Sequence, residues 1–454
     1  MPEQLSHDPY RDETFARYPA LDASAVETAI GLAAEAQAAW ANVPLGKRLT
    51  HLRDLVQVLG RNQGDWARLA TREMGKPLEQ ARSEVAKCAR LCRHYSDEAA
   101  GILAPRAIQT EAKKSYVRHD PLGLVLAVMP WNYPFWQVFR CAVPAIIAGN
   151  GVVLKHASNV PGCAMACEAA FREAGFPEHL FTTLLMDAQH VAGAIAHPAV
   201  QAISLTGSED AGSAVAAHAG KHLKPCVLEL GGSDPFLVLA DADMEVAVST
   251  AVQARLMNNG QSCIAAKRFL VEESVADAFL AQLCEQLETM HVGDPLLAET
   301  HVGPLAKPAF ADVLNDQVDR SIAAGAKRVF KGKAPRRKGF FAPMVLDGVQ
   351  PGMAAFDEEL FGPVFAVVRV ADADQAVALA NASAYGLGAS VWTADTKRAE
   401  AIAAKLSVGA VFINAMVVSD PRLPFGGVKR SGYGRELAGE GLLAFTNIKS
   451  VSVA

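Results

Sequence analysis

Residues 122–134 read LGLVLAVMPWNYP, and this stretch carries the main information on the fold. An apolar run over 124–129 is followed at once by two prolines that bracket Trp131, Asn132 and Tyr133. A nearly continuous apolar run of this length is typical of a strand that is covered on both faces. We therefore predict a buried strand that ends in a rigid turn, the place where α/β sheets bind their ligands.

Four further apolar runs of strand length follow this one, separated by Ala-rich segments with helical spacing. They span residues 151–155, 181–186, 202–206 and 226–230. A second alternating series then occupies residues 266–271, 343–345, 365–370, 389–392 and 410–413. Strands that alternate with helices predict βαβ units and parallel sheets, so we expect two α/β domains.

The segments that flank these two series have different patterns. Residues 24–42, 47–62 and 79–103 show the spacing of amphipathic helices. Residues 105–120 are polar and flanked by turn residues, as expected of an excursion from the first domain, and residues 446–454 alternate weakly, like a late strand. With 454 residues, the chain is too long for a single hydrophobic core.

The composition is that of a well-buried globular protein. Hydrophobic residues make up 51% and charged residues 20%, and the formal net charge of -5 argues against a nucleic-acid partner. No apolar run approaches the roughly 18 residues that a membrane span needs, and the first residues lack a secretory pattern. We therefore expect a cytoplasmic protein that binds neither a membrane nor a nucleic acid.

The eight cysteines include no C-x-x-C pair and lie mostly among Ala, Leu and Val. Buried free thiols in a reducing compartment account for nearly all of them. Cys88 and Cys92, like Cys163 and Cys167, are four residues apart on helix-like segments, a spacing that would also suit metal ligands. No pair of His or carboxylate residues completes such a set, so no metal site is predicted.

Cys263 differs from the other cysteines because it follows the turn sequence NGQS at 259–262 instead of lying in an apolar run. A reactive thiol needs partial exposure and a positive or N–H-rich setting. Cys263 is therefore the candidate nucleophile, with a buried structural thiol as the alternative.

Two polar residues lie at the ends of predicted strands. Glu229, in ELGG at 229–232, is costly to bury unless it is paired or functional, and desolvation would raise its pKa toward the range of a general base. Asn132 could donate its side-chain amide to a developing oxyanion. The alternatives are a salt-bridged structural Glu229 and an Asn132 that caps a local backbone group.

Three loops carry less meaning on their own. TGS at 206–208, followed by Gly212, lies between a predicted strand and a helix, where backbone N–H groups could bind a pyrophosphate. The G-x-G-x-x-G fingerprint is absent, however, and Ser208 could simply cap the helix. ELFGP at 359–363 and PFGGVKRSG at 424–432 are typical of turns.

Taken in this order, these six segments resemble the aldehyde dehydrogenase superfamily over nearly the whole chain. LKHASN at 154–159 and ELGGSDPF at 229–236 resemble a bacterial branch of that superfamily, the succinate-semialdehyde dehydrogenases. The resemblance implies that Cys263 attacks the aldehyde carbon as a thiolate. It also implies that the Asn132 amide and the Cys263 N–H hold the oxyanion, that hydride passes to a nicotinamide, and that Glu229 activates the water that hydrolyses the thioester.

The resemblance implies NADP or NAD as the cofactor. Lys155 and Glu359 would bind its ribose hydroxyls. The other groove residues would be Met129, Trp131, Ser158, Gly207, Ser208, Gly212, Leu230 and Phe361. In NAD-preferring relatives the position of Ser158 is commonly Glu, whose charge repels a 2′-phosphate, so we expect NADP to be tolerated and even preferred. His156 would add attraction if it is protonated; a solvated loop histidine is the alternative.

A semialdehyde ends in a carboxylate, so its pocket should contain a cation or several donors. Arg140 lies eight residues after Asn132, as does an Arg that relatives use for this carboxylate. Its alternative role is an ion pair on a helix surface. Trp136, Gln137 and Ser419 would be its companions.

One departure concerns a second Arg that some relatives have six residues before the catalytic Cys. This chain has Met257 there, and the nearby Arg255 should point elsewhere if the segment is helical. Carboxylate binding would then be looser, or the substrate longer or less charged.

The resemblance also implies an architecture of three parts. These are a Rossmann-like cofactor domain (1–104 and 120–231), an α/β catalytic domain (232–438) and a small β oligomerisation element (105–119 and 439–454). The last would join subunits into a homodimer or homotetramer through an isologous interface. The active site would lie between the two larger domains.

Three alternatives stay open for the function. The chain could oxidise another short aliphatic aldehyde or semialdehyde. It could be a CoA-acylating dehydrogenase, although such relatives generally lack the Glu base. It could also be a non-enzymatic binding protein on the same fold, which would have no need to keep Cys263, Glu229, Asn132 and Lys155 together.

Overall fold

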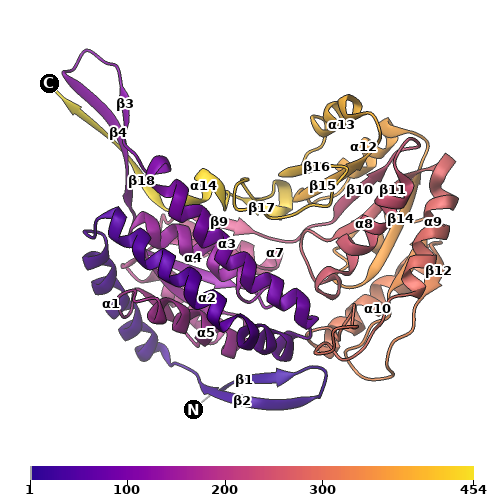
Figure 1. The fold of residues 1–454 in the computed structure, drawn as a ribbon, viewed down its shortest axis with the longest axis horizontal. Coiled ribbons are helices and arrows are strands. Elements are labelled where there is room, and N and C mark those ends of the chain that lie inside the picture. The colour runs from indigo at the N-terminus through magenta and orange to yellow at the C-terminus, as the bar shows by residue number, and fades with distance from the viewer. Residues whose placement is uncertain (1–2) are drawn as a thin grey trace.

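Two β-sheets, each covered by helices on both faces, form the two halves of the molecule (Figure 1). The computed structural model describes residues 3–454. Short connections join the strands to their helices, as in other α/β proteins. In the described part of the chain, no helix is both long and apolar enough to span a lipid bilayer.

The sheet of the first half has six strands in the order β17-β9-β8-β5-β6-β7. They are β5 (Leu124–Met129), β6 (Gly151–His156), β7 (Phe181–Thr183), β8 (Val200–Thr206), β9 (Cys226–Glu229) and β17 (Gly432–Tyr433). All neighbours are parallel except β17, which runs antiparallel to β9. The five strands predicted for this half are confirmed, although β7 ends three residues early.

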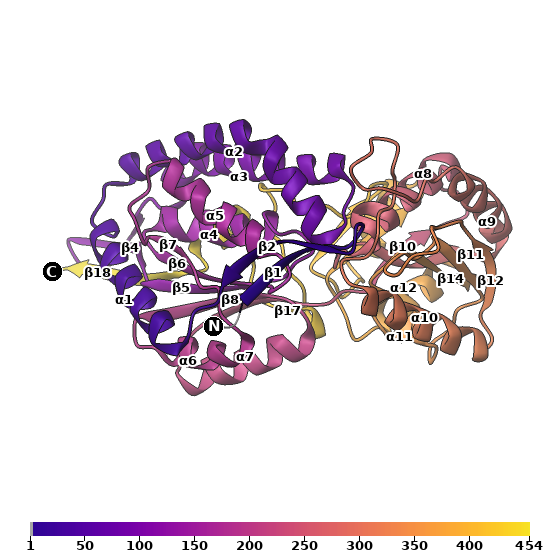
Figure 2. The same ribbon diagram turned by 90° about the horizontal axis from the view of Figure 1, so that it is seen from below.

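Helices cover both faces of this sheet, as Figure 2 shows for α2 and α3 on one side and α6 and α7 on the other. They are α1 (Ala23–Trp40), α2 (Leu45–Met74), α3 (Leu78–Ile102), α4 (Trp136–Ala148), α5 (Pro161–Glu173), the 3₁₀ turn η1 (Ala188–His190), α6 (Val191–Ala196) and α7 (Glu209–Lys221). Asp22 caps α1 by accepting from the Ala25 N–H. Gly75 ends α2 in a left-handed conformation (φ 80°), where a Cβ would lie 2.4 Å from the Pro304 carbonyl oxygen.

The sheet of the second half has seven strands in the order β12-β13-β14-β11-β10-β15-β16. They are β10 (Asp234–Val238), β11 (Ala266–Glu272), β12 (Lys327–Lys331), β13 (Met344–Asp347), β14 (Val364–Val370), β15 (Gly388–Trp392) and β16 (Ala410–Ile413). The five predicted strands are confirmed. β10 was not predicted because it begins with Asp-Pro in a turn-like sequence, and β12 because it is an exposed, charged edge strand.

The helices of the second half complete its layers. They are α8 (Met244–Leu256), η2 (Met257–Gly260), α9 (Glu273–Glu288), α10 (Pro308–Ala323), α11 (Ala354–Asp357), α12 (Ala373–Asn381) and α13 (Thr396–Ala403). The chain then returns to the first half through η3 (Lys429–Ser431), β17 and α14 (Ala438–Leu443). This return places the 424–432 segment beside strand β9.

A three-stranded arm projects from the first half (Figure 1). It consists of β3 (Arg106–Ile108), β4 (Lys114–Pro121) and β18 (Thr446–Val453). β18 pairs antiparallel with β4 along its full length, so the predicted excursion and the predicted late strand meet in one sheet. The arm exposes apolar side chains, among them Ile448 at 69%.

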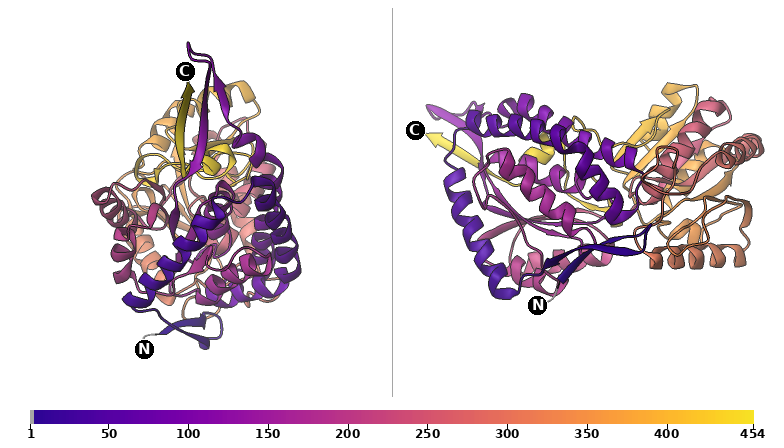
Figure 3. Two further views of the ribbon diagram at one scale, coloured as in Figure 1. Left: turned by 90° about the vertical axis from the view of Figure 1, so that its left-hand side faces the viewer. Right: turned by 60° about the horizontal axis from the view of Figure 1, so that its bottom comes forward.

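A hairpin of β1 (Glu3–Asp8) and β2 (Glu13–Pro19) precedes the first helix and was not predicted. Figure 3 shows it running from the first half toward the second. At its tip, Tyr10 packs edge-on against Phe340, with ring centroids 6.1 Å apart. The hairpin therefore connects the two halves.

Candidate active site

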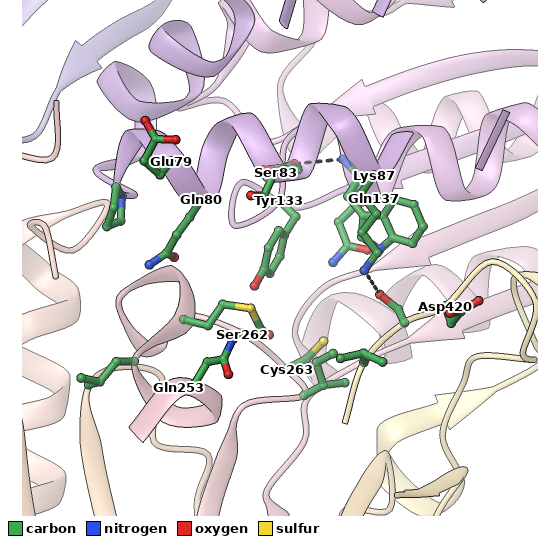
Figure 4. Close-up of a pocket in the computed structure, with 18 of the residues that line it drawn as sticks. Glu79, Gln80, Ser83, Lys87, Tyr133, Gln137, Gln253, Ser262, Cys263 and Asp420 are labelled. Atoms are coloured by element: carbon green, nitrogen blue, oxygen red, sulfur yellow. Dashed lines mark hydrogen bonds between the residues drawn. The ribbon is translucent and has the colours of Figure 1, made fainter. Parts of the chain in front are cut away.

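A cavity of about 850 Å³ lies where helices α3 and α4 of the first half face α8 and the 418–425 loop of the second. Cys263 opens into it (Figure 4). The four residues predicted to bind substrate also line it, namely Trp136, Gln137, Arg140 and Ser419. Side chains from segments far apart in the sequence thus share one pocket with the candidate nucleophile.

The turn before Cys263 has an unusual backbone that hydrogen bonds from both halves hold in place. Asn258 and Asn259 adopt left-handed conformations (φ 59° each), and at Gly260 (φ 74°) a Cβ would lie 2.4 Å from the backbone of Gly362. The Asn259 Nδ2 donates to the Gly75 and Pro304 carbonyls, at 2.9 Å each. These contacts fix the direction in which Cys263 leaves the turn.

Burial dominates the electrostatics of the Cys263 thiol. Desolvation raises its pKa to about 12, although Arg140 and Lys267 favour the thiolate. The positive charges predicted near Cys263 are therefore present, but their effect on its pKa is smaller than that of burial. Lys267, which the sequence did not single out, donates from Nζ to the Cys263 carbonyl at 2.8 Å.

Glu229 ends strand β9 with only 2% of its surface exposed. Within residues 3–454, neither carboxylate oxygen has a hydrogen-bond partner, and no ion pair reaches it. Desolvation raises its pKa well above the usual range. The salt-bridged alternative is therefore wrong, and this carboxyl has the raised pKa expected of a general base.

The loop at 424–432 lies against Glu229 and leaves room for its side chain. A Cβ at Gly426 would lie 2.6 Å from the Glu229 Oε1. Nearby, the Leu230 N–H donates to the Ser431 carbonyl at 3.0 Å. The 424–432 segment, whose sequence is typical only of turns, thus encloses the buried carboxyl of Glu229.

Arg140 lies on α4 with 1% of its surface exposed. It forms an ion pair with Glu436, donates to the Thr206 hydroxyl at 3.3 Å, and lies 4.5 Å from the Phe425 ring centroid. The alternative for Arg140 is an ion pair on a helix surface. The ion pair is present, but it is buried and does not lie on the surface. The charge of Arg140 is already balanced by Glu436.

Asn132 connects the two halves at the site. Its Nδ2 donates to the Gln261 carbonyl at 3.1 Å, and its side chain is 4% exposed. The amide carries a second N–H that this bond does not use. Because the acceptor is 129 residues away, the alternative of a local cap is not observed.

A buried ion pair between Lys76 and Glu84 supports the turn that carries Asn132. The Glu84 carboxylate accepts from the N–H groups of Phe135 and Trp136, at 2.8 and 2.9 Å. The ammonium of Lys76 lies 4.2 Å from the centroid of the Tyr133 ring. The sequence reasoning missed this cluster, because Lys76 and Glu84 read as ordinary charges of helical segments.

The residues predicted for the cofactor lie at the carboxyl ends of the first sheet and on the loop that faces it. Trp131 stacks on Phe310 and meets Phe361 edge-on, with centroids 5.0 and 5.8 Å apart. Lys155 is at the end of β6 and makes no hydrogen bond or ion pair within residues 3–454; burial lowers its pKa. Ser158 is exposed just beyond it.

The other predicted groove residues also have structural partners. Ser208 caps α7 by accepting from the Ala211 N–H, as its alternative reading expected. At Gly212, a Cβ would lie 2.5 Å from the Leu230 side chain, so the glycine permits close packing. Glu359 accepts from the Gly232 N–H at 3.1 Å and pairs with Lys267 at 3.3 Å. Gly207 directly follows strand β8, and Met129 ends strand β5.

Neither interpretation of His156 is correct. Its side chain is buried, with ring nitrogens 3.3 Å from the Met129 carbonyl and 2.9 Å from the Pro134 carbonyl. Desolvation lowers its pKa to about 4, so it is neutral and attracts no phosphate. It instead braces the proline turn against strand β6.

Arg255 points away from the pocket, as expected for its place on α8. Its guanidinium donates to the carbonyls of Val364 at 2.7 Å, Leu360 at 2.6 Å and Gly362. It therefore holds the loop that carries Glu359 and does not replace the second Arg at the position of Met257.

Comparisons with known proteins identify the class to which this fold and site belong. The model of the aldehyde dehydrogenase family matches residues 3–451, and the chain belongs to that family. It is 44% identical to the NAD(P)+-dependent succinate semialdehyde dehydrogenase Sad of Escherichia coli K12, covering 98% of this chain and 97% of the relative. It is 46% identical to an NADP+-dependent succinate-semialdehyde dehydrogenase of Mycobacterium ulcerans, covering 98% of both chains.

Solved structures agree with this placement. The Streptococcus pyogenes succinic semialdehyde dehydrogenase in complex with NADP+ superposes with a TM-score of 0.97 at 34% identity, covering 99% of both chains. The predicted α/β fold of the superfamily is therefore confirmed.

Proposed function

We propose that this chain oxidises succinate semialdehyde to succinate with NADP or NAD as cofactor. One observation carries the proposal: Cys263 opens into a cavity that also holds Lys87, which makes no ion pair within residues 3–454, and Arg140, which is paired with Glu436. An aldehyde with a distal carboxylate matches a nucleophile at one end and positive charge nearby. The relatives named for this reaction give independent support.

The chemistry begins with a proton transfer. The thiol of Cys263 is protonated at neutral pH, so it must lose its proton before it can attack. The proton passes to water in the pocket, and Arg140 and Lys267 favour the thiolate that remains. The Sγ then forms a bond to the aldehyde carbon, and the carbonyl π electrons move to oxygen. The Asn132 amide and the Cys263 N–H stabilise that oxyanion.

The second half of the reaction releases the acid. NAD(P), when bound, supplies the acceptor for the hydride that the substrate carbon loses. Glu229 takes a proton from water, and the resulting hydroxide attacks the thioester that Cys263 carries. The C–S bond breaks, the carboxylic acid leaves, and the thiolate is regenerated.

The cofactor residues fit a dinucleotide. Lys155 is a largely buried ammonium that has no acceptor within residues 3–454, and ribose hydroxyls would supply one. Glu359 would accept from hydroxyls of the other ribose. Ser158 adds no carboxylate near the adenosine ribose, so a 2′-phosphate meets no repulsion from it.

We further propose that the six-stranded half binds the cofactor and the seven-stranded half carries Cys263. The arm of β3, β4 and β18 would be the oligomerisation element of a homodimer or homotetramer. Its exposed apolar residues and its projection from the body support this role.

The test is kcat/KM with NADP for succinic semialdehyde against butanal, which lacks the carboxylate. A charge-assisted contact should favour the semialdehyde about ten- to a hundredfold. Near-equal values would refute the semialdehyde assignment and leave a dehydrogenase of uncharged aldehydes.

A further inference from the structure

Lys87 extends from helix α3 into the substrate pocket, and two contacts fix the position of its ammonium. Its Nζ donates to the Ser419 hydroxyl at 2.5 Å and lies 4.1 Å from the Trp136 ring centroid. Figure 4 shows it extending from α3 into the cavity that contains Cys263. The ammonium is therefore held between residues of both halves of the molecule.

The carboxylates nearest to Lys87 already have other partners. Asp420 follows Ser419 directly but binds Arg422 with both oxygens, at 2.8 and 2.7 Å. Glu84, one turn before Lys87 on α3, pairs with Lys76. Within residues 3–454, Lys87 makes no ion pair, whereas Arg140 across the pocket is paired with Glu436.

We propose that Lys87 is the specificity-determining cation that binds the distal carboxylate of the substrate, with Ser419 as its companion donor. A partly buried ammonium without an anionic partner loses solvation that a bound carboxylate restores. The Ser419 oxygen accepts from Lys87, which leaves its O–H free to donate to the same carboxylate. This inference rests on the proposed semialdehyde substrate and names the residue that recognises it.

The charges around Lys87 make this recognition depend on pH. Burial, together with Arg140 and Arg90, lowers its pKa to about 7, while Glu84 and Cys88 act in the opposite direction and Asp420 faces it from the 418–425 loop. The ammonium is present below that pKa and is lost above it. Preference for the semialdehyde over butanal should therefore fall as pH rises from 6 to 9.

The experiment measures kcat/KM for succinic semialdehyde and for butanal in three variants and the parent. Lys87→Met removes the charge and keeps most of the length, Lys87→Arg restores a charge, and Arg90→Met is the matched control. Arg90 lies on the same helix and lines the same pocket but is exposed, whereas Ser419 accepts from Lys87. We expect Lys87→Met to reduce the semialdehyde-to-butanal ratio about ten- to a hundredfold, mainly through KM.

The outcomes separate this inference from the proposed function. If the parent enzyme shows no preference for the semialdehyde, the proposed substrate itself is refuted. If the parent prefers it but Lys87→Met keeps the ratio, or Arg90→Met lowers it equally, the role of Lys87 is refuted. Partial rescue by Lys87→Arg supports a charge contact. Should Lys87→Met fail to fold, the parent's ratio between pH 6 and 9 decides, and a constant ratio overturns the inference.

Discussion

Helix α3 and strand β9 each bury a carboxylate, and the surroundings of the two carboxylates are opposite. Glu84 is 4% exposed and has an ammonium and two backbone N–H groups as partners. Glu229 is 2% exposed and has no hydrogen-bond partner within residues 3–454. Burial penalises both charges, but within residues 3–454 only Glu84 has hydrogen-bond and ion-pair partners that compensate for it.

The same contrast divides the two lysines of this region. Lys76 is paired with Glu84 and supports the proline turn, whereas Lys87 faces the pocket and makes no ion pair within residues 3–454. Compensated charges hold the structure, and uncompensated charges remain available for substrate, water or protons. This difference makes distinct predictions for stability and for rate.

The largest expected effect comes from Cys263, where the reaction itself takes place. Cys263→Ala should reduce kcat by about 10⁴-fold or more with little change in Tm, because the covalent route is lost. Cys284→Ala is the control, since this half-buried cysteine of α9 is outside the pocket. Retention of more than a tenth of the activity by Cys263→Ala would refute the assignment.

Glu229→Gln should reduce steady-state turnover by about 10²–10⁴-fold, because a base is lost and the shape is kept. Glu229→Gln should, by contrast, stabilise the folded protein. The folded state keeps the Glu229 proton to higher pH than the unfolded chain does, so the parent loses stability as pH rises above the usual carboxyl pKa. The Tm advantage of the variant should therefore grow between pH 5 and 8, and a variant less stable than the parent at pH 8 would contradict this account.

Glu84→Gln should act on stability first. Breaking a buried, hydrogen-bonded ion pair leaves the Lys76 charge uncompensated, and such changes cost about 3–5 kcal/mol. Denaturant unfolding should show that loss, while the substitution of Glu229 by Gln should not. Equal stability changes at the two sites would remove the distinction between compensated and uncompensated carboxylates.

The smallest expected effect concerns the cofactor. Ser158→Glu places a carboxylate at an exposed position beyond β6, and it should lower kcat/KM for NADP about tenfold through repulsion of the 2′-phosphate. The value for NAD should stay within about twofold. A parallel loss for both cofactors would place Ser158 outside the phosphate subsite.

The same contrast separates what the sequence predicted from what it did not. Cys263, Glu229 and Asn132 stood out because each breaks a local pattern, at a turn or at a strand end. Lys76, Glu84 and Lys87 did not, because charges on amphipathic helices usually face solvent. Only tertiary packing brings Glu84 to backbone groups 51 residues away.

His156 is a further residue whose surroundings could not be predicted from the sequence, in this case because it is more buried than expected. It looked solvated because it follows a strand, yet the proline turn folds over it and removes both ring nitrogens from solvent. The hairpin β1–β2 and strand β12 lacked apolar runs because they are peripheral. The order of the motifs and the buried strands other than β10 could thus be predicted, whereas contacts between distant segments could not.

The central claim is that Cys263 forms a covalent acyl intermediate which Glu229 resolves. The most direct measurement is a single-turnover reaction of Glu229→Gln with succinic semialdehyde and NADP, followed by mass spectrometry of the peptides. The account predicts a burst of NADPH equal to the number of active sites and an acyl group on the peptide that contains Cys263. A reaction without a burst, or an acyl group on another cysteine, would contradict it.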